Sequence, residues 1–216
     1  MVAKRHVVST RVSIPGPSGV LEGVVDASVD SAAAVAVICH PHPQQQGTMQ
    51  NKVVSTVARA FTQLGATAVR FNFRGVGGSA GAYDGGEGER DDALAVVAWC
   101  RGRWPGWRLY LGGFSFGAAV ALAVASRVGP AGLVTVALPI DRLPADFLAP
   151  DCPWLLVHGS ADDVVPADAV VARCGALTSP PRVVLLEGVG HFFHGSLVVL
   201  GDSVADFFGA DFAPLV

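Results

Sequence analysis

The chain has 216 residues, of which 51% are hydrophobic and 15% are charged, and its formal net charge is -3. This composition suits one α/β domain over residues 1–216, large enough to bury roughly 70% of the surface that the unfolded chain exposes. A slightly acidic chain without a long basic run excludes both an electrostatic nucleic-acid footprint and a basic membrane anchor.

The distribution of apolar residues indicates neither a secretory signal nor a membrane span. The first thirty positions lack an apolar core of signal-peptide length, and no later apolar run is long enough to cross a bilayer. The four cysteines have no C-x-x-C spacing and lie within or beside apolar segments: Cys39, Cys100, Cys152 and Cys174. This usage is typical of reduced, packed thiols, so we expect a cytoplasmic protein.

Strand and helix patterns alternate along the chain. Two Val-rich stretches, residues 5–14 and 20–27, flank a Pro-Gly turn and predict an antiparallel hairpin. Further strands are predicted over residues 33–39, 66–73, 108–112, 132–138, 153–158 and 182–187. Helices are predicted over residues 51–64, 87–103, 118–125, 167–176 and 194–209. The alternation predicts a mostly parallel sheet with an antiparallel N-terminal edge and helices on both faces.

One five-residue stretch, Gly113 to Gly117, lies between an apolar strand pattern and an Ala-rich helix pattern. Its G-x-S-x-G spelling places Ser115 where a strand must turn sharply into a helix. The flanking glycines remove Cβ atoms that would collide in such a turn, and the helix N-terminus favours developing negative charge. The pattern is typical of the nucleophile elbow of α/β-hydrolases, so Ser115 is the predicted nucleophile.

A serine nucleophile needs a base, and the base needs a carboxylate that fixes its tautomer. Asp162 follows the strand predicted over residues 153–158 in an H-G-x-x-D-x-x-V-P pattern, and His191 follows the last strand in a Gly-Val-Gly loop. Both lie at carboxyl ends of strands, where parallel sheets of this kind bind their ligands. Asp163 remains an alternative carboxylate, and His194 remains an alternative base.

Acyl transfer also needs two backbone N–H groups that hold the tetrahedral oxygen. Phe116, the residue after the nucleophile, is expected to supply one of them. The loop after residue 39 reads His40-Pro41-His42-Pro43, and its two prolines have no N–H. His42 and Gln44 are the nearby donors, and we favour the main chain of His42.

The elbow, the proline loop and the loops of Asp162 and His191 occur together with three further stretches: Gly47-Thr48-Met49, Asn51-Lys52-Val53-Val54 and Phe71-Asn72-Phe73-Arg74-Gly75. Over nearly the whole chain, this set resembles small bacterial serine α/β-hydrolases related to dienelactone hydrolase. The resemblance implies that Ser115, Asp162 and His191 form a triad. Dienelactone hydrolases proper use a cysteine nucleophile, so their lactone substrate is not carried over.

The segment between two predicted strands, residues 139–152, is too short for the helical cap that many α/β-hydrolases insert there. We therefore expect an open site without a cap domain. His40, Phe114 and Phe192 are predicted to line its substrate pocket. The expected activity is that of a carboxylesterase-type serine hydrolase on a small-molecule acyl substrate, an ester or else a thioester or lactone, without a cofactor or a metal.

Three rival interpretations rest on weaker patterns. Gly75, Gly77 and Ala80 satisfy the G-x-G-x-x-A spacing of dinucleotide binding, but a flexible loop follows where that motif opens a helix. His40 and His42 suggest a metal-dependent hydrolase, yet no H-x-x-x-H or H-E-x-x-H spacing accompanies them. A non-catalytic binding or scaffold protein with this fold would ordinarily have lost a triad member, and all three predicted members are present.

Overall fold

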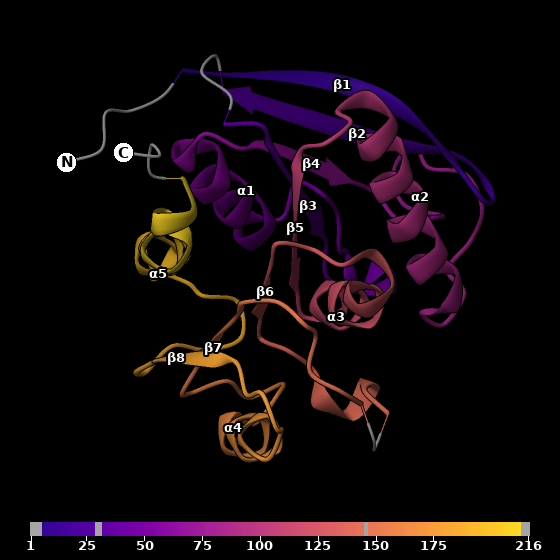
Figure 1. The fold of residues 1–216 in the computed structure, drawn as a ribbon. Coiled ribbons are helices and arrows are strands. Elements are labelled where there is room, and N and C mark those ends of the chain that lie inside the picture. Colours follow the sequence, from indigo (N-terminus) through magenta and orange to yellow (C-terminus); the bar gives the residue numbers. More distant parts are fainter. Residues whose placement is uncertain (1–5, 29–31, 145–146, 213–216) are drawn as a thin grey trace.

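The computed structural model describes residues 6–28, 32–144 and 147–212 (Figure 1). Within these ranges, eight strands form one sheet in the order β1-β2-β4-β3-β5-β6-β7-β8. The strands are β1 (Val7–Gly16), β2 (Gly19–Ser28), β3 (Ala34–Cys39), β4 (Thr67–Phe71), β5 (Arg108–Phe114), β6 (Gly132–Val136), β7 (Trp154–Gly159) and β8 (Arg182–Leu186). β2 pairs antiparallel with both β1 and β4, and all other neighbours are parallel, which confirms the predicted sheet.

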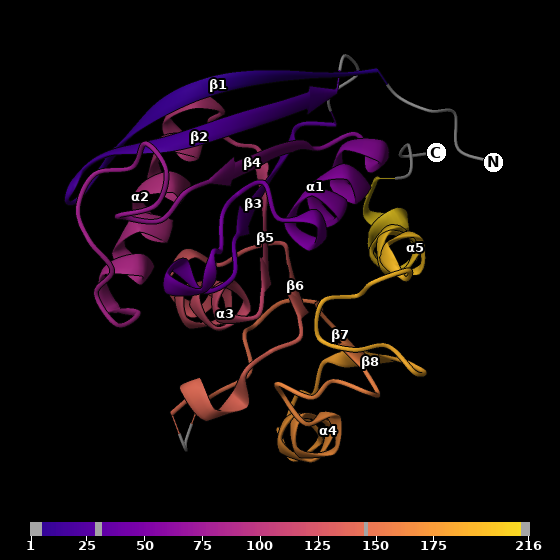
Figure 2. The same ribbon diagram turned by 180° about the vertical axis from the view of Figure 1, so that it is seen from behind.

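Helices pack on both faces of this sheet (Figures 1 and 2). They are α1 (Lys52–Leu64), α2 (Glu87–Arg103), α3 (Phe116–Val128), α4 (Ala167–Gly175) and α5 (Leu197–Phe208). The buried residues of α1 and α5 form one core cluster with one face of the strands, and those of α2, α3 and α4 form a second cluster with the other face. The sheet therefore lies between two apolar layers, as its nearly continuous apolar strands require.

Helix α1 illustrates how local sequence sets the ends of an element. The Asn51 side chain accepts hydrogen bonds from the N–H groups of Val53 and Val54, which caps the first turn. Gly65 closes the helix at φ 107, a left-handed conformation that suits glycine. These are the limits that the sequence pattern predicts.

Other boundaries differ from the prediction where the backbone leaves regular geometry. β6 ends at Val136 because Ala137 adopts φ 49, and α5 begins at Leu197 because Gly195 adopts φ 75. β4 ends at Phe71, and the Phe73 N–H donates instead to a histidine ring. The local pattern of apolar residues cannot predict hydrogen bonds between residues that are far apart in sequence.

The order of the strands places two loops side by side. β3 lies between β4 and β5, so the chain leaves β3 toward one side and later returns on its other side. The carboxyl ends of β3 and β5 border the point where such open sheets bind ligands. The loop after β3 carries His42, and the turn after β5 carries Ser115.

All four cysteines are free thiols, and three of them are buried: Cys39, Cys100 and Cys174. No helix in the described ranges combines the length and the apolar character needed to cross a membrane.

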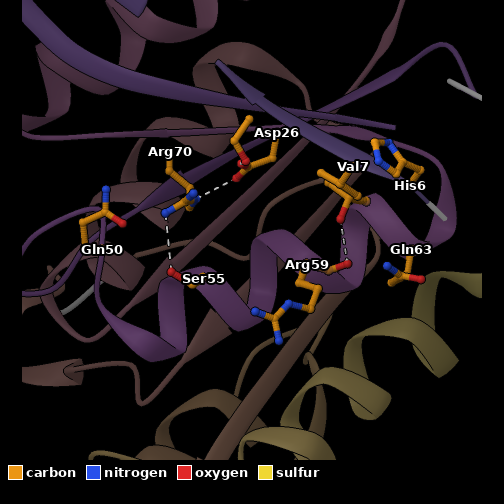
Figure 3. A pocket seen from close by; sticks show the side chains of 10 residues that line it. His6, Val7, Asp26, Gln50, Ser55, Arg59, Gln63 and Arg70 are labelled. Carbon is orange, nitrogen blue, oxygen red and sulfur yellow. Dashed lines mark hydrogen bonds and ion pairs between the residues drawn. The ribbon is translucent and has the colours of Figure 1, made fainter. Parts of the chain in front are cut away.

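A buried ion pair joins β2 to β4 (Figure 3). Arg70 Nε donates to Asp26 Oδ2 at 2.8 Å, and each side chain is only 10% exposed. The pair lines a hollow of about 570 Å³ between the N-terminal strands and α1. Arg70 Nη1 also donates to the carbonyl oxygen of Met49 at 2.9 Å, while the Met49 N–H donates to Asn72 Oδ1 at 2.9 Å. Both backbone polar groups of Met49 are thus held, which fixes the loop before α1.

Replacing Asp26 by Asn should destabilise the fold, because it leaves the buried Arg70 guanidinium without its charged partner. We expect the free energy of unfolding, measured by urea denaturation, to fall by about 3 kcal/mol. Glu87→Gln is the matched control, since the Glu87–Arg90 pair is exposed and its loss should cost less than about 1 kcal/mol. Equal losses in the two variants would contradict the role assigned to the buried pair.

Candidate active site

Ser115 lies on a sharp turn between β5 and α3, with φ 52 and ψ -121. A Cβ atom on Gly113 would lie 2.1 Å from the Gly117 carbonyl oxygen, and one on Gly117 would lie 2.4 Å from the carbonyl oxygens of Cys39 and His40. No side chain fits at either position. The two glycines therefore allow α3 to approach the ends of β3 and β5, and this approach holds Ser115 in its strained conformation.

The structure brings Ser115, His191 and Asp162 together. The Ser115 hydroxyl lies 3.1 Å from His191 Nε2, and His191 Nδ1 lies 2.8 Å from Asp162 Oδ2. Because the ionised carboxylate is an acceptor only, Nδ1 carries the proton and donates to Asp162. Nε2 then presents a lone pair to the Ser115 O–H, as a general base requires.

Asp162 is held by the turn that follows it. Its Oδ1 accepts hydrogen bonds from the N–H groups of Val164 at 2.9 Å and Val165 at 2.8 Å. The carboxylate is buried, with 7% of the residue exposed, so these donors offset much of the cost of removing its charge from water. Oδ2 is left to face His191.

The two alternatives from the sequence lie elsewhere. Asp163 is exposed, and none of the described hydrogen bonds or ion pairs joins it to His191. His194 is also exposed and does not cap α5, whose N-cap is Ser196. His194 lies beside Phe192, with ring centroids 6.0 Å apart. The described geometry therefore favours Asp162 and His191 over their neighbours.

The two residues predicted to supply oxyanion donors, Phe116 and His42, lie in contact with each other. Phe116 is the first residue of α3, so its N–H has no partner within the helix. The ring of His42 packs 5.1 Å from the ring of Phe116, measured between centroids. The Gln44 N–H is already used, since it donates to His42 Nδ1 at 3.2 Å. Of the two donors considered from the sequence, Gln44 is thus engaged, and the main chain of His42 stays the predicted donor.

The His42 ring braces its own loop. Nδ1 accepts from Gln44, so the proton lies on Nε2, which donates to the Tyr83 hydroxyl at 3.2 Å. Burial and the nearby charge of Arg142 lower the pKa of His42, whereas Glu89 raises it. The neutral ring therefore links the proline loop to the loop that precedes α2 by hydrogen bonds.

The structure places His40 away from the predicted substrate pocket, because the residue is fully buried. Its Nε2 accepts from the Phe73 N–H at 3.0 Å, and its Nδ1–H donates to the Pro41 carbonyl oxygen at 2.6 Å. Burial lowers the pKa of His40 to about 4, against an opposing effect of the Pro41 carbonyl. His40 thus ties the loop after β3 to the end of β4.

Phe114 and Phe192 both line one hollow, of about 520 Å³, which reaches from these rings to the loop before α1. Both rings contact His191, with ring centroids 5.3 Å apart for Phe114 and 5.2 Å apart for Phe192. The opposite wall is polar and comes from the loop before α1, including Gln46 and Gln50. A smaller hollow, of about 210 Å³, adjoins Phe116.

The sequence analysis assigned no role to three residues that support the site: His158, Tyr83 and Asn72. His158 stands inside the H-G-x-x-D-x-x-V-P pattern, where a polar residue in an apolar strand could have signalled a buried hydrogen bond. Tyr83 contacts His42 across 41 residues of sequence, and Asn72 contacts Met49 across 23.

Among the residues that the structure describes, no three His, Cys, Asp or Glu side chains lie together in a way that could hold a metal ion.

Comparison with known proteins places this geometry among serine hydrolases. The sequence model of a family described as X-Pro dipeptidyl-peptidase (S15 family) matches residues 27–140. An uncharacterized protein of Rickettsia prowazekii is 32% identical over 203 residues, which cover 89% of this chain and 85% of that protein.

Two solved structures are similar over nearly the whole chain. An α/β serine hydrolase without a lid from Xanthomonas campestris has a TM-score of 0.90 and 39% identity, covering 96% of both chains. An α/β serine hydrolase homologue from Coxiella burnetii has a TM-score of 0.87 and 40% identity, covering 91% of this chain and 96% of the other. These likenesses agree with the absence of a cap that residues 139–152 predict.

Acid should destabilise the fold through His40. The unfolded chain binds a proton on this ring below a pKa of 6.5, whereas the folded chain resists protonation down to about 4. Stability that is present above pH 6.5 is therefore lost as the pH falls toward 4, by roughly 3 kcal/mol. Urea denaturation across this range should give a flatter pH dependence for His40→Gln than for the wild type. His194→Gln controls for the loss of an exposed histidine, and a slope unchanged by His40→Gln would refute the assignment.

Proposed function

We propose that this chain, which belongs to the family described as X-Pro dipeptidyl-peptidase (S15 family) and is a lidless α/β serine hydrolase, cleaves carboxylic esters through an acyl-enzyme on Ser115. The proposal is carried by one observation, the hydrogen-bonded series from Asp162 through His191 to Ser115, with distances of 2.8 and 3.1 Å. Thioesters and lactones also contain a carbonyl that Ser115 could attack, so we include them among the proposed substrates.

In the acylation step, Ser115 Oγ attacks the carbonyl carbon while its proton passes to His191 Nε2. The resulting imidazolium is stabilised by the Asp162 carboxylate, whose two oxygens are held by N–H donors. The main-chain N–H groups of Phe116 and His42 hold the negative oxygen of the tetrahedral intermediate. His191 then returns the proton to the leaving alcohol oxygen, and the C–O bond breaks.

In the deacylation step, water takes the place of the alcohol. His191 Nε2 removes a proton from the water, whose oxygen attacks the acyl carbon, and the proton passes to Ser115 Oγ as the acyl bond breaks. The products are a carboxylic acid and the regenerated serine. No cofactor is needed for either step.

The positions of the hollows support an assignment of the two halves of the substrate. The leaving oxygen must lie near His191 to receive its proton, so the alcohol occupies the hollow of about 520 Å³ beside Phe114 and Phe192. The acyl group then extends toward the hollow of about 210 Å³ beside Phe116. The smaller volume favours a short acyl group, and the larger one admits a bulkier alcohol.

Ser115→Ala should lower kcat/KM for p-nitrophenyl acetate by roughly 10⁴-fold or more, because the three residues act as a unit. His191→Ala and Asp162→Asn should each cause losses of several orders of magnitude. Wild-type enzyme should form a fluorophosphonate adduct on Ser115 that intact-protein and peptide mass spectrometry detect. A fully active Ser115→Ala variant would reject the proposal.

Matched controls come from the neighbouring positions. Asp163→Asn should retain most of the activity, and His194→Ala should change mainly KM, since that ring borders the larger hollow. A larger loss at either position than at Asp162 or His191 would show that the base or the carboxylate is misassigned. Absence of both turnover and labelling in the wild type would favour a scaffold role. Activity abolished by a chelator and restored by zinc would favour a metal-dependent hydrolase.

The size of the two hollows predicts the response to substrate length. With one alcohol, kcat/KM should fall steeply once the acyl chain exceeds about four carbons, whereas with an acetyl group, bulkier aromatic alcohols should be accepted. A matrix of esters that varies both halves measures this, with a thioester and an X-Pro p-nitroanilide beside them. Preference for long acyl chains would contradict the assignment, and faster cleavage of the anilide than of any ester would identify a peptidase.

A further inference from the structure

We propose that His158 is a positioning residue for Asp162, an inference that rests on the proposed function. His158 belongs to β7 and is fully buried. Alternation along the strand places it on the same face as Trp154 and Leu156, which belong to the core layer of α3 and α4. A histidine in that apolar layer needs hydrogen-bond partners to offset its burial.

Its partners lie in the loop that carries the carboxylate. His158 Nε2 lies 2.9 Å from the carbonyl oxygen of Val165 and 3.4 Å from Asp162 Oδ2. His158 Nδ1, in contrast, is buried without a hydrogen-bond partner among the described residues. Two acceptors face Nε2 and none faces Nδ1, so the proton resides on Nε2.

With this donor, both backbone polar groups of Val165 are hydrogen-bonded. The Val165 N–H donates to Asp162 Oδ1, and the Val165 carbonyl oxygen accepts from His158. The loop that bears the carboxylate is thereby tied back to β7. His158 fixes the turn directly, and through the turn it fixes the direction in which Asp162 points.

The same donor also acts on the carboxylate charge. Asp162 Oδ2 accepts from His191 Nδ1 at 2.8 Å and faces the His158 Nε2–H at 3.4 Å, while Oδ1 accepts from two backbone amides. Removing His158 would leave Oδ2 facing His191 alone among the described N–H groups. The carboxylate could then turn away from His191, which matters most when His191 is an imidazolium in the transition state.

Three substitutions at His158 distinguish the role of its Nε2 from that of its Nδ1. Phe keeps a buried ring but removes the donor, Gln can place an amide N–H near the position of Nε2, and Asn can place one only near that of Nδ1. We expect His158→Phe and His158→Asn to lower kcat roughly tenfold with KM unchanged, and His158→Gln to recover most of kcat. The proton resonance of His191 Nδ1–H should shift in the Phe and Asn variants and return in the Gln variant.

Trp154→Phe is the matched control, because it removes one buried side-chain hydrogen bond, to Thr135, from the same strand. It should lower stability but leave kcat and the His191 resonance unchanged. If His158→Phe does not fold, the Gln and Asn variants carry the comparison, and equal kcat values for those two would overturn the inference. A folded Phe variant with wild-type kcat, a loss confined to KM, or an equal kcat loss in Trp154→Phe would also overturn it.

Fluorophosphonate labelling separates this inference from the proposed function. Failure of Ser115 to react in the wild type would overturn both. Rapid labelling of the wild type with an equal rate in His158→Phe would overturn only the role of His158. Labelling slowed roughly tenfold in His158→Phe and restored in His158→Gln would support both.

Discussion

The absence of any room for a side chain at Gly113 and Gly117 is the constraint on which the site depends. Backbone carbonyl oxygens lie 2.1 to 2.4 Å from where their Cβ atoms would be, so the first turn of α3 rests directly on the ends of β3 and β5. This contact sustains the unfavourable φ of Ser115, since relaxing it would require the helix to separate from the sheet. It also sets the first N–H of α3 beside the loop of His42. One steric condition therefore positions the nucleophile and the candidate oxyanion donors together.

Four histidines, His40, His42, His158 and His191, contact the loops and residues of the candidate site, and their hydrogen-bond partners assign them different tasks. His40 and His42 each use one nitrogen as an acceptor from a backbone N–H, so each is held as a neutral ring. His191 and His158 both face Asp162, but only His191 has its other nitrogen directed at a hydroxyl. A ring becomes a base where one nitrogen is oriented by a carboxylate and the other meets a transferable proton. The other three histidines, in the loop after β3 and in β7, hold neighbouring segments in place by hydrogen bonds.

Much of this arrangement could be predicted from the sequence, because the sheet, the helices and the elbow depend on local periodicity and short motifs. Asp162 and His191 could be named because carboxyl ends of parallel strands share one edge of the sheet. His40 illustrates the limit, since its sequence position suggested a pocket, whereas its partner Phe73 lies 33 residues away and draws the ring into the interior. The ion pair between Arg70 and Asp26 was not predicted for the same reason, because the two residues are 44 positions apart. Pairing between distant strands decides such contacts, and no local pattern records it.

The attachment of Met49 has a consequence for how this site can change. The main-chain N–H and C=O groups of Met49 are held by Asn72 and Arg70, and the side chains of Thr48 and Asn51, which face the hollow of about 520 Å³, accept further hydrogen bonds from backbone N–H groups. Gln50 can therefore be exchanged for other residues while the path of the backbone stays the same, whereas Gln46, at φ 60, accepts only residues that tolerate a left-handed conformation. Under the proposed function, substrate preference and catalytic geometry are then separable at Gln50, which makes this position the natural place to begin a library, with the elbow and its partners left untouched.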